Sequence, residues 1–98
     1  MFIVNWNDVG IEEYSYKDAK RIAKEMSLEY GDASIIREIM EFYDKYKVPT
    51  WTWEEFYKNG KIVNRTEIPR RYHDVKNEWV DIESWIEDYP KSLDRNLR

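Results

Sequence analysis

The alternation of hydrophobic and polar positions predicts a short strand and then a helix near the N-terminus. Residues 2–6 are apolar and β-prone, and the Asn7-Asp8-Val9-Gly10 sequence that follows has turn chemistry. From Ser15 to Tyr30, apolar residues recur at three- and four-residue spacing, which indicates an amphipathic helix. A capping box begins at Ser15, and Gly31 occupies the position of a left-handed C-terminal cap.

The next segment predicts a second helix, which begins at Asp32 or Ser34 and runs to about Lys47. Pro49 ends it, because the residue before a proline avoids the helical conformation. Since only Gly31-Asp32 would connect the two helices, we expect an antiparallel αα-hairpin. The apolar face of the second helix would consist of Ile35, Ile36, Ile39, Phe42, Tyr43 and Tyr46.

Residues 50–66 fit two interpretations. Asn59-Gly60 resembles the two-residue turn of a β-hairpin. However, Thr52 and Glu55 also have capping-box spacing, and Asn59-Gly60 can equally end a short helix. We favour a short helix at 52–59 and then a strand at 61–66, which would pair with residues 2–6.

From Pro69 to Pro90 the pattern predicts one long C-terminal helix. The alternative is a strand through Glu78–Ile82, with Asp81 capping a shorter helix, and residues 91–98 are expected to be a frayed polar tail. The expected fold is therefore α+β and helix-dominated, in one small domain spanning residues 1–98. The stripe that supports the long helix contains Tyr72, Val75, Trp79, Ile82, Ile86 and Tyr89, at spacings of three and four residues.

Composition limits the class of protein. The chain has 98 residues, which is enough for one domain, and its 42% hydrophobic and 37% charged residues are typical of a globular chain. It has no cysteine, no apolar run near the roughly 20 residues of a membrane span, and no signal-peptide pattern at the N-terminus. We therefore expect a soluble cytoplasmic protein that does not associate with a membrane.

An acidic and aromatic surface is the first functional candidate. On the long-helix interpretation, four carboxylates and one tryptophan share a face at spacings of 4, 3, 4 and 3 residues. Like charges at these spacings repel, so a partner with a basic surface would explain them, whereas the simpler interpretation is a solvated face that aids solubility. The predicted partner-binding residues are Asp74, Glu78, Asp81, Trp85 and Asp88.

A basic, nucleic-acid-binding face is the alternative. It is disfavoured by the net charge of −4, because phosphate neutralisation usually needs a basic balance. The residues that would form it are Lys17, Lys20, Arg21, Lys24, Arg70 and Arg71.

Aromatic residues are unusually frequent, with five tryptophans and eight tyrosines. In a strand, Trp51 and Trp53 would point to one face, and we expect them in the core. If one of them were exposed, it would be the preferred binding hot spot.

Catalysis has little support. His73 is the only histidine, and no nucleophile elbow, phosphate loop or paired ligand motif is present. We therefore expect no enzyme activity, no cofactor and no metal.

The function expected from the sequence is non-enzymatic protein binding, as a small inhibitor or adaptor. The bias toward Ile, Lys, Glu, Tyr and Asn, together with small size and acidity, suggests a phage-encoded inhibitor of a host nucleic-acid-handling defence enzyme. A homo-oligomeric structural subunit is a further alternative.

Overall fold

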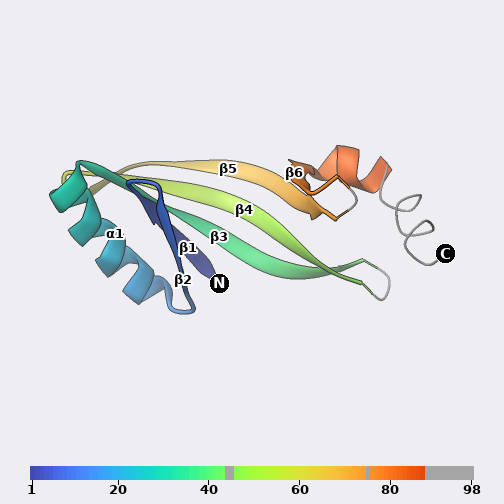
Figure 1. Cartoon of the computed structure of the whole chain (residues 1–98), viewed down its shortest axis with the longest axis horizontal. Coiled ribbons are helices and arrows are strands. Elements are labelled where there is room, and N and C mark those ends of the chain that lie inside the picture. The colour runs from blue at the N-terminus through green and yellow to red at the C-terminus, as the bar shows by residue number, and fades with distance from the viewer. Residues whose placement is uncertain (44–45, 75, 88–98) are drawn as a thin grey trace.

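The computed structural model describes residues 1–43, 46–74 and 76–87, and it shows a six-stranded antiparallel sheet with a helix on one face (Figure 1). The strand order in the sheet is β2-β1-β3-β4-β5-β6, and residues 82–87 are helical. This mostly β architecture contradicts the expected helix-dominated α+β fold. The elements are β1 (Phe2–Trp6), β2 (Val9–Glu13), α1 (Tyr16–Tyr30), β3 (Asp32–Tyr43), β4 (Tyr46–Lys58), β5 (Lys61–His73) and β6 (Glu78–Asp81).

The predicted strand at residues 2–6 and the helix after Ser15 are confirmed, but strand β2 was not predicted, and it contains Val9 and Gly10 of the expected turn. β1 occupies residues 2–6, and Asn7 and Asp8 adopt positive φ angles of 43° and 64° in the turn that leads into β2. Helix α1 begins after Ser15, whose side-chain oxygen accepts a hydrogen bond from the backbone N–H of Asp18. Gly31 ends the helix with φ 98°.

The predicted second helix is wrong, and the αα-hairpin with it, because this segment forms β3 and the start of β4. The isoleucines of β3 mimic a helical pattern because both faces of the strand are buried here. Ile35 is fully buried on the face that α1 covers, and its neighbour Ile36 is 8% exposed on the other face. When apolar residues lie on both faces of a strand, the sequence does not show the two-residue alternation that identifies a strand. The isoleucines are β-branched, and β-branched side chains favour a strand over a helix.

The hairpin interpretation of residues 50–66 is the correct one, and the predicted short helix at 52–59 is wrong. Asn59 and Gly60 adopt φ angles of 50° and 83°, as a two-residue hairpin turn with left-handed residues requires. The strand that follows continues to His73 as β5. It pairs with β4 and β6 instead of the predicted partner β1.

The long C-terminal helix is also wrong. Pro69 lies inside β5, beside an irregularity in the pairing with β4, so its missing N–H does not interrupt the ladder. The alternative of a strand followed by a shorter helix is the better description, since β6 covers 78–81 and the helix covers 82–87. Val75, Tyr89 and the predicted tail at 91–98 lie outside the described residues.

The sheet has two halves. In the proximal half, α1 packs on β1, β2, residues 32–37 of β3, 53–58 of β4 and 61–67 of β5. The distal half contains the rest of β3, β4 and β5, with β6 and residues 82–87, at the opposite end of a molecule 49 Å long (Figure 1). The main core lies in the proximal half and contains Val4, Ala19, Ala23, Ala33, Ile35 and Tyr57.

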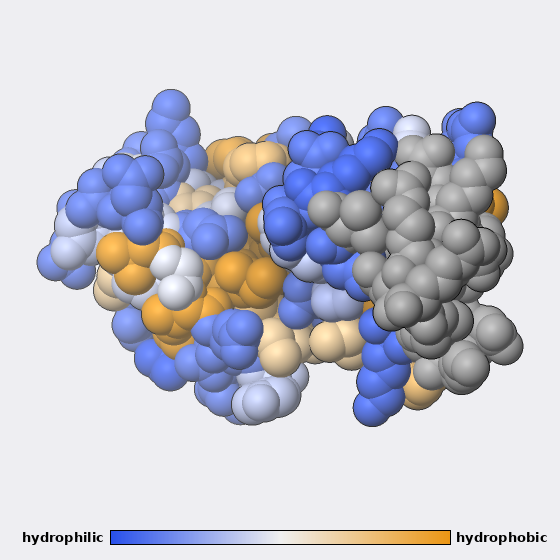
Figure 2. Space-filling model, turned by 45° about the vertical axis from the view of Figure 1, so that its right-hand side comes forward, coloured by the Kyte–Doolittle hydropathy of each residue, from blue (hydrophilic) through white to orange (hydrophobic). Residues whose placement is uncertain are grey.

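Apolar side chains also reach the surface. Figure 2 shows them interleaved with hydrophilic side chains on one side of the molecule. Two of the most exposed are Leu28 on α1, at 67%, and Phe42 near the end of β3, at 69%. Among the described residues, no helix is long and apolar enough to cross a membrane.

Candidate functional site

One face of the distal half carries a cluster of aromatic side chains. Residues paired across neighbouring strands point to the same face, so the registers assign each side chain to a face. We call the face opposite α1 the open face. Its distal part, which we call the distal surface, consists of Glu38, Met40, Phe42, Lys47, Pro49, Trp51, Arg70, Tyr72, Trp79 and Asp81.

A β-bulge at Thr52 puts Trp51 on this surface. Trp53 pairs with Arg37 and Trp51 pairs with Glu38, so Thr52 has no partner of its own on β3. Because Arg37 and Glu38 are consecutive, the two tryptophans point to opposite faces. The prediction that both would share a face in a strand is therefore wrong. Trp53 packs toward α1, and its ring lies 5.7 Å from that of Tyr16.

Three aromatic rings from three strands hold one another in place on the distal surface. Trp51 and Trp79 stack with ring centroids 3.8 Å apart and 17° between their planes. Tyr72 meets Trp79 edge-on at 5.6 Å. The indole Nε1 of Trp51 donates a hydrogen bond to Oε1 of Glu38 at 3.1 Å. The rings are half-buried and fixed on strands, so they form a rigid platform.

Two highly exposed apolar side chains extend this platform. Met40 is 56% exposed and Phe42 is 69% exposed, and both lie on the same face of β3 as Glu38. The Lys47 ammonium lies 5.7 Å from the centre of the Phe42 ring, within the range of a cation–π interaction. Exposed apolar side chains beside fixed tryptophans are typical of a binding surface.

The charges on the distal surface are balanced. Arg70 and Asp81 are paired in register between β5 and β6, and both are exposed. Glu38 and Lys47 contribute one charge of each sign. The surface therefore has no net charge to attract phosphate groups or a strongly basic partner.

The reverse side of the distal half is closed by a buried tryptophan. Trp85, from the helical residues 82–87, is fully buried, and its Nε1 donates a hydrogen bond to the backbone carbonyl of Tyr72 at 3.1 Å. The Arg71 guanidinium lies 4.9 Å from the Trp85 ring and also forms an ion pair with Glu41. His73 is buried there as well, at 1% exposure. These contacts support the strands that carry the distal surface.

The structure does not bring the predicted acidic residues onto one face. Asp74 lies in the turn between β5 and β6, and Glu78 and Asp81 are the ends of β6, pointing to opposite faces of the sheet. Trp85 is buried rather than exposed among them. Asp88 lies outside the described residues. The shared face depended on a continuous helix, which the β5–β6 hairpin replaces.

The predicted basic residues separate into two groups. The four on α1 are together, with Lys17, Arg21 and Lys24 exposed. Lys20 is half-buried, and its Nζ lies 5.1 Å from the centre of the Tyr16 ring. Arg21 forms an ion pair with Glu25 at 3.6 Å. Arg70 and Arg71 are far along β5 and point to opposite faces, so they do not join the α1 group.

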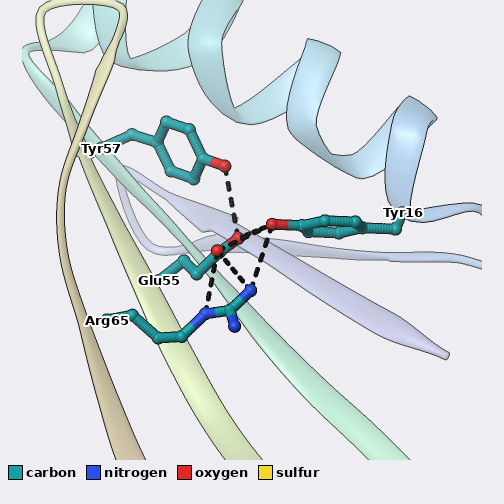
Figure 3. A network of polar contacts seen from close by, with 4 residues as sticks. All are labelled: Tyr16, Glu55, Tyr57 and Arg65. Atoms are coloured by element: carbon teal, nitrogen blue, oxygen red, sulfur yellow. Dashed lines mark hydrogen bonds and ion pairs between the residues drawn. The ribbon is translucent and has the colours of Figure 1, made fainter.

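A polar network in the proximal half ties α1 to the sheet (Figure 3). Glu55 is 2% exposed and accepts hydrogen bonds from the hydroxyls of Tyr16, at 2.6 Å, and Tyr57, at 3.3 Å. Arg65 donates to the same carboxylate from Nε at 3.0 Å and from Nη2 at 2.7 Å. The Arg65 guanidinium also lies 4.2 Å from the Trp53 ring centre.

The electrostatics of this network favour a structural role. Burial and the nearby Glu55 carboxylate raise the pKa of Tyr57 well above its ordinary value of 10.0. Burial and the hydrogen bond to Glu55 also raise the pKa of Tyr16. Both phenols therefore remain neutral hydrogen-bond donors to the Glu55 carboxylate at neutral pH. Within the described ranges, no three His, Asp or Glu residues are placed to hold a metal ion.

Sequence reasoning missed the distal surface because its members are far apart in the chain. Trp51, Tyr72 and Trp79 meet only through the β4–β5–β6 registers. The available signal was the Asn59-Gly60 pair, whose preference for hairpin turns would have placed β4 beside β5.

Comparisons of this chain with protein-family models, curated proteins and solved structures give no match.

Proposed function

We propose that this chain is a non-enzymatic protein-binding module and that the distal surface is its binding site. The observation that carries the proposal is the pair of exposed apolar side chains, Met40 and Phe42, beside the stacked Trp51 and Trp79. Large aromatic anchors held rigidly, with flexible methionine beside them, are enriched at protein interfaces. The absence of cysteine is compatible with a module that works in the cytoplasm.

The shape and charge of the surface favour a protein over other partners. Its rings lie on extended strands, and the Trp51 indole is hydrogen-bonded to Glu38 within the surface. A phosphate backbone would need a basic surface, and the charges here cancel. We expect a partner that presents a complementary apolar patch with a mixed-charge rim. The narrower idea of a phage-encoded defence inhibitor gains no support from the fold or from the comparisons.

The test compares two variants that each add negative charge at exposed apolar positions. The double variant Met40→Asp/Phe42→Asp alters the distal surface. The control, Tyr14→Asp/Leu28→Asp, alters side chains that are 84% and 67% exposed outside it. Each tagged protein is incubated with nuclease-treated lysate of the organism that encodes the chain, and captured proteins are quantified by mass spectrometry.

We expect a partner in stoichiometric amounts with the wild type and the control, and its loss with the Met40/Phe42 variant. Circular dichroism checks that both variants are folded. Equal capture by all three proteins would refute the distal surface as the site. A partner captured only in a parallel incubation with untreated lysate would instead favour the basic face of α1.

A further inference from the structure

A groove at the proximal end of the sheet is separate from the distal surface. It lies where the β1–β2 turn meets the first residues of β3 and the last residues of β4, and it encloses about 650 Å³. Small-molecule sites commonly measure about 300–1,000 Å³. The groove is therefore large enough for a ligand of one or two rings.

The floor of the groove contains polar groups without an internal partner. Asn5, Ser34 and Phe56 lie side by side on the open face, because Ser34 pairs in register with both of the others. Ser34 is 8% exposed, yet its hydroxyl makes no hydrogen bond to any residue that the structure describes. The same holds for the Asn5 carboxamide. Asn5 is half-buried, and neither group is among the fully buried unpaired atoms, so both are accessible to a ligand in the groove.

Gly10 leaves room for the Asn5 carboxamide. A Cβ atom at residue 10 would lie only 2.9 Å from Oδ1 of Asn5. Any other residue at this position of β2 would displace the carboxamide from its present place at the edge of the groove. The glycine is not needed for a left-handed backbone here, since its φ is not positive. The structural role of Gly10 is therefore to leave space for the Asn5 side chain.

The charges around the groove favour an uncharged ligand. Asp8 and Asp32 line it and would repel a phosphate or carboxylate group. Lys58 also lines the groove and is paired in register with Asp32, so its positive charge offsets the attraction of the two carboxylates for a cation. On the floor of the groove, the recognition groups are the Ser34 hydroxyl, the Asn5 carboxamide and the ring of Phe56, which is 36% exposed.

We propose that this groove binds a neutral saccharide. Sugar hydroxyls are both donors and acceptors, which matches Asn5 and Ser34, and they can donate to the carboxylates of Asp8 and Asp32. The apolar C–H face of a sugar ring fits against an aromatic ring such as Phe56. This site is independent of the distal surface, so the molecule would carry two binding sites at opposite ends of β3.

The test uses saturation-transfer NMR and calorimetry with named probes. These are glucose, galactose, N-acetylglucosamine, maltose, lactose and chitobiose, with spermidine and adenosine monophosphate as charged probes. The site variants are Ser34→Ala and Phe56→Ala. Their matched controls are Ser84→Ala and Phe42→Ala, which change the same residue types at exposed positions of the distal half.

We expect at least one sugar to bind saturably, with magnetisation transfer strongest to its ring C–H protons. Losing one hydrogen bond or the ring contact should raise the dissociation constant about tenfold in each site variant. The controls should bind like the wild type, and because Phe42→Ala alters the distal surface, the two proposals can fail separately. Absence of saturable binding by all six sugars, unchanged binding in both site variants, or preference for a charged probe would overturn the proposal.

Discussion

The proximal and distal halves of the sheet are built on the same three long strands but are stabilised differently. The proximal half buries β1, β3 and β4 under α1, and the Glu55 network adds hydrogen bonds between helix and sheet. The distal half is covered by the short helical segment at 82–87, and its buried side chains among the described residues include Trp85, His73, Val48 and Thr50. The half with the larger core exposes few rings on its open face, whereas the half with the smaller core carries the aromatic platform. We therefore expect stability and binding to separate along the molecule.

The largest stability effect should come from Trp85→Ala. Replacing a buried tryptophan with alanine typically costs about 3–5 kcal/mol in the free energy of unfolding, because a large cavity remains. The loss of structure should begin in the distal half, since Trp85 contacts Arg71 and the backbone of Tyr72 there. Urea denaturation measures the stability, and hydrogen exchange should show faster exchange at β6 with protection retained in α1. Equal acceleration in both halves would mean that they unfold as one unit.

Glu55→Ala tests the proximal half. Removing this carboxylate leaves the Tyr16 and Tyr57 hydroxyls and the Arg65 guanidinium without their acceptor. Breaking a buried pair costs about 3–5 kcal/mol, and we expect about 2–4 kcal/mol because half of the Arg65 side chain is exposed. Glu54→Ala is the matched control on the opposite face, with an expected change within about 0.5 kcal/mol. Similar urea midpoints for the two variants would contradict a stabilising network.

The same network should make the folded state less stable at alkaline pH. The folded-state pKa of Tyr57 is raised above the ordinary value of 10.0 that it has in the unfolded chain. Its contribution is therefore fully present below about pH 10 and is lost as the pH rises toward the folded-state pKa. We expect the urea midpoint of the wild type to fall between about pH 8 and about pH 11, and to fall less in Tyr57→Phe. Tyr14→Phe, at an 84% exposed position, should keep the wild-type slope.

The smallest stability effect is expected on the distal surface itself. The Met40→Asp/Phe42→Asp variant changes side chains that are more than half exposed, so its free energy of unfolding should change by no more than about 0.5 kcal/mol. Thermal unfolding followed by circular dichroism measures this. A large decrease in the melting temperature would show that Met40 and Phe42 contribute to packing, and the difference between the halves would then be smaller than proposed.

Sequence reasoning succeeded where local signals decide the structure. The Ser15 N-cap, the apolar spacing along α1 and the Gly31 C-cap are all encoded within one continuous stretch of the chain, residues 15–31. It failed for β3, where Ile35 and Ile36 are buried on opposite faces and mimic a helical pattern. It also failed where the three- and four-residue spacing around Tyr72 and Trp79 arose from a β5–β6 hairpin.

The candidate sites were less predictable than the fold. The distal surface needs the registers of β3, β4, β5 and β6 together, and pairing between distant segments is not encoded in any local pattern. The predicted acidic face depended on a helix that does not form. Trp85 was predicted as a partner-binding residue on an exposed face, but the structure buries it in the interior of the distal half.

The bulge at Thr52 makes the length of β4 as important as its composition. Side chains alternate between faces with each residue, and Thr52 is the single residue that offsets this alternation relative to β3. Deleting Thr52 would remove the extra residue, so Trp51 and Trp53 would become consecutive and would still point to opposite faces, as their partners Glu38 and Arg37 do. A one-residue deletion elsewhere in β4 would keep the bulge and would exchange the faces of all side chains on one side of the deletion. We therefore expect deletion of Thr52 to be tolerated better than deletion of another residue of β4.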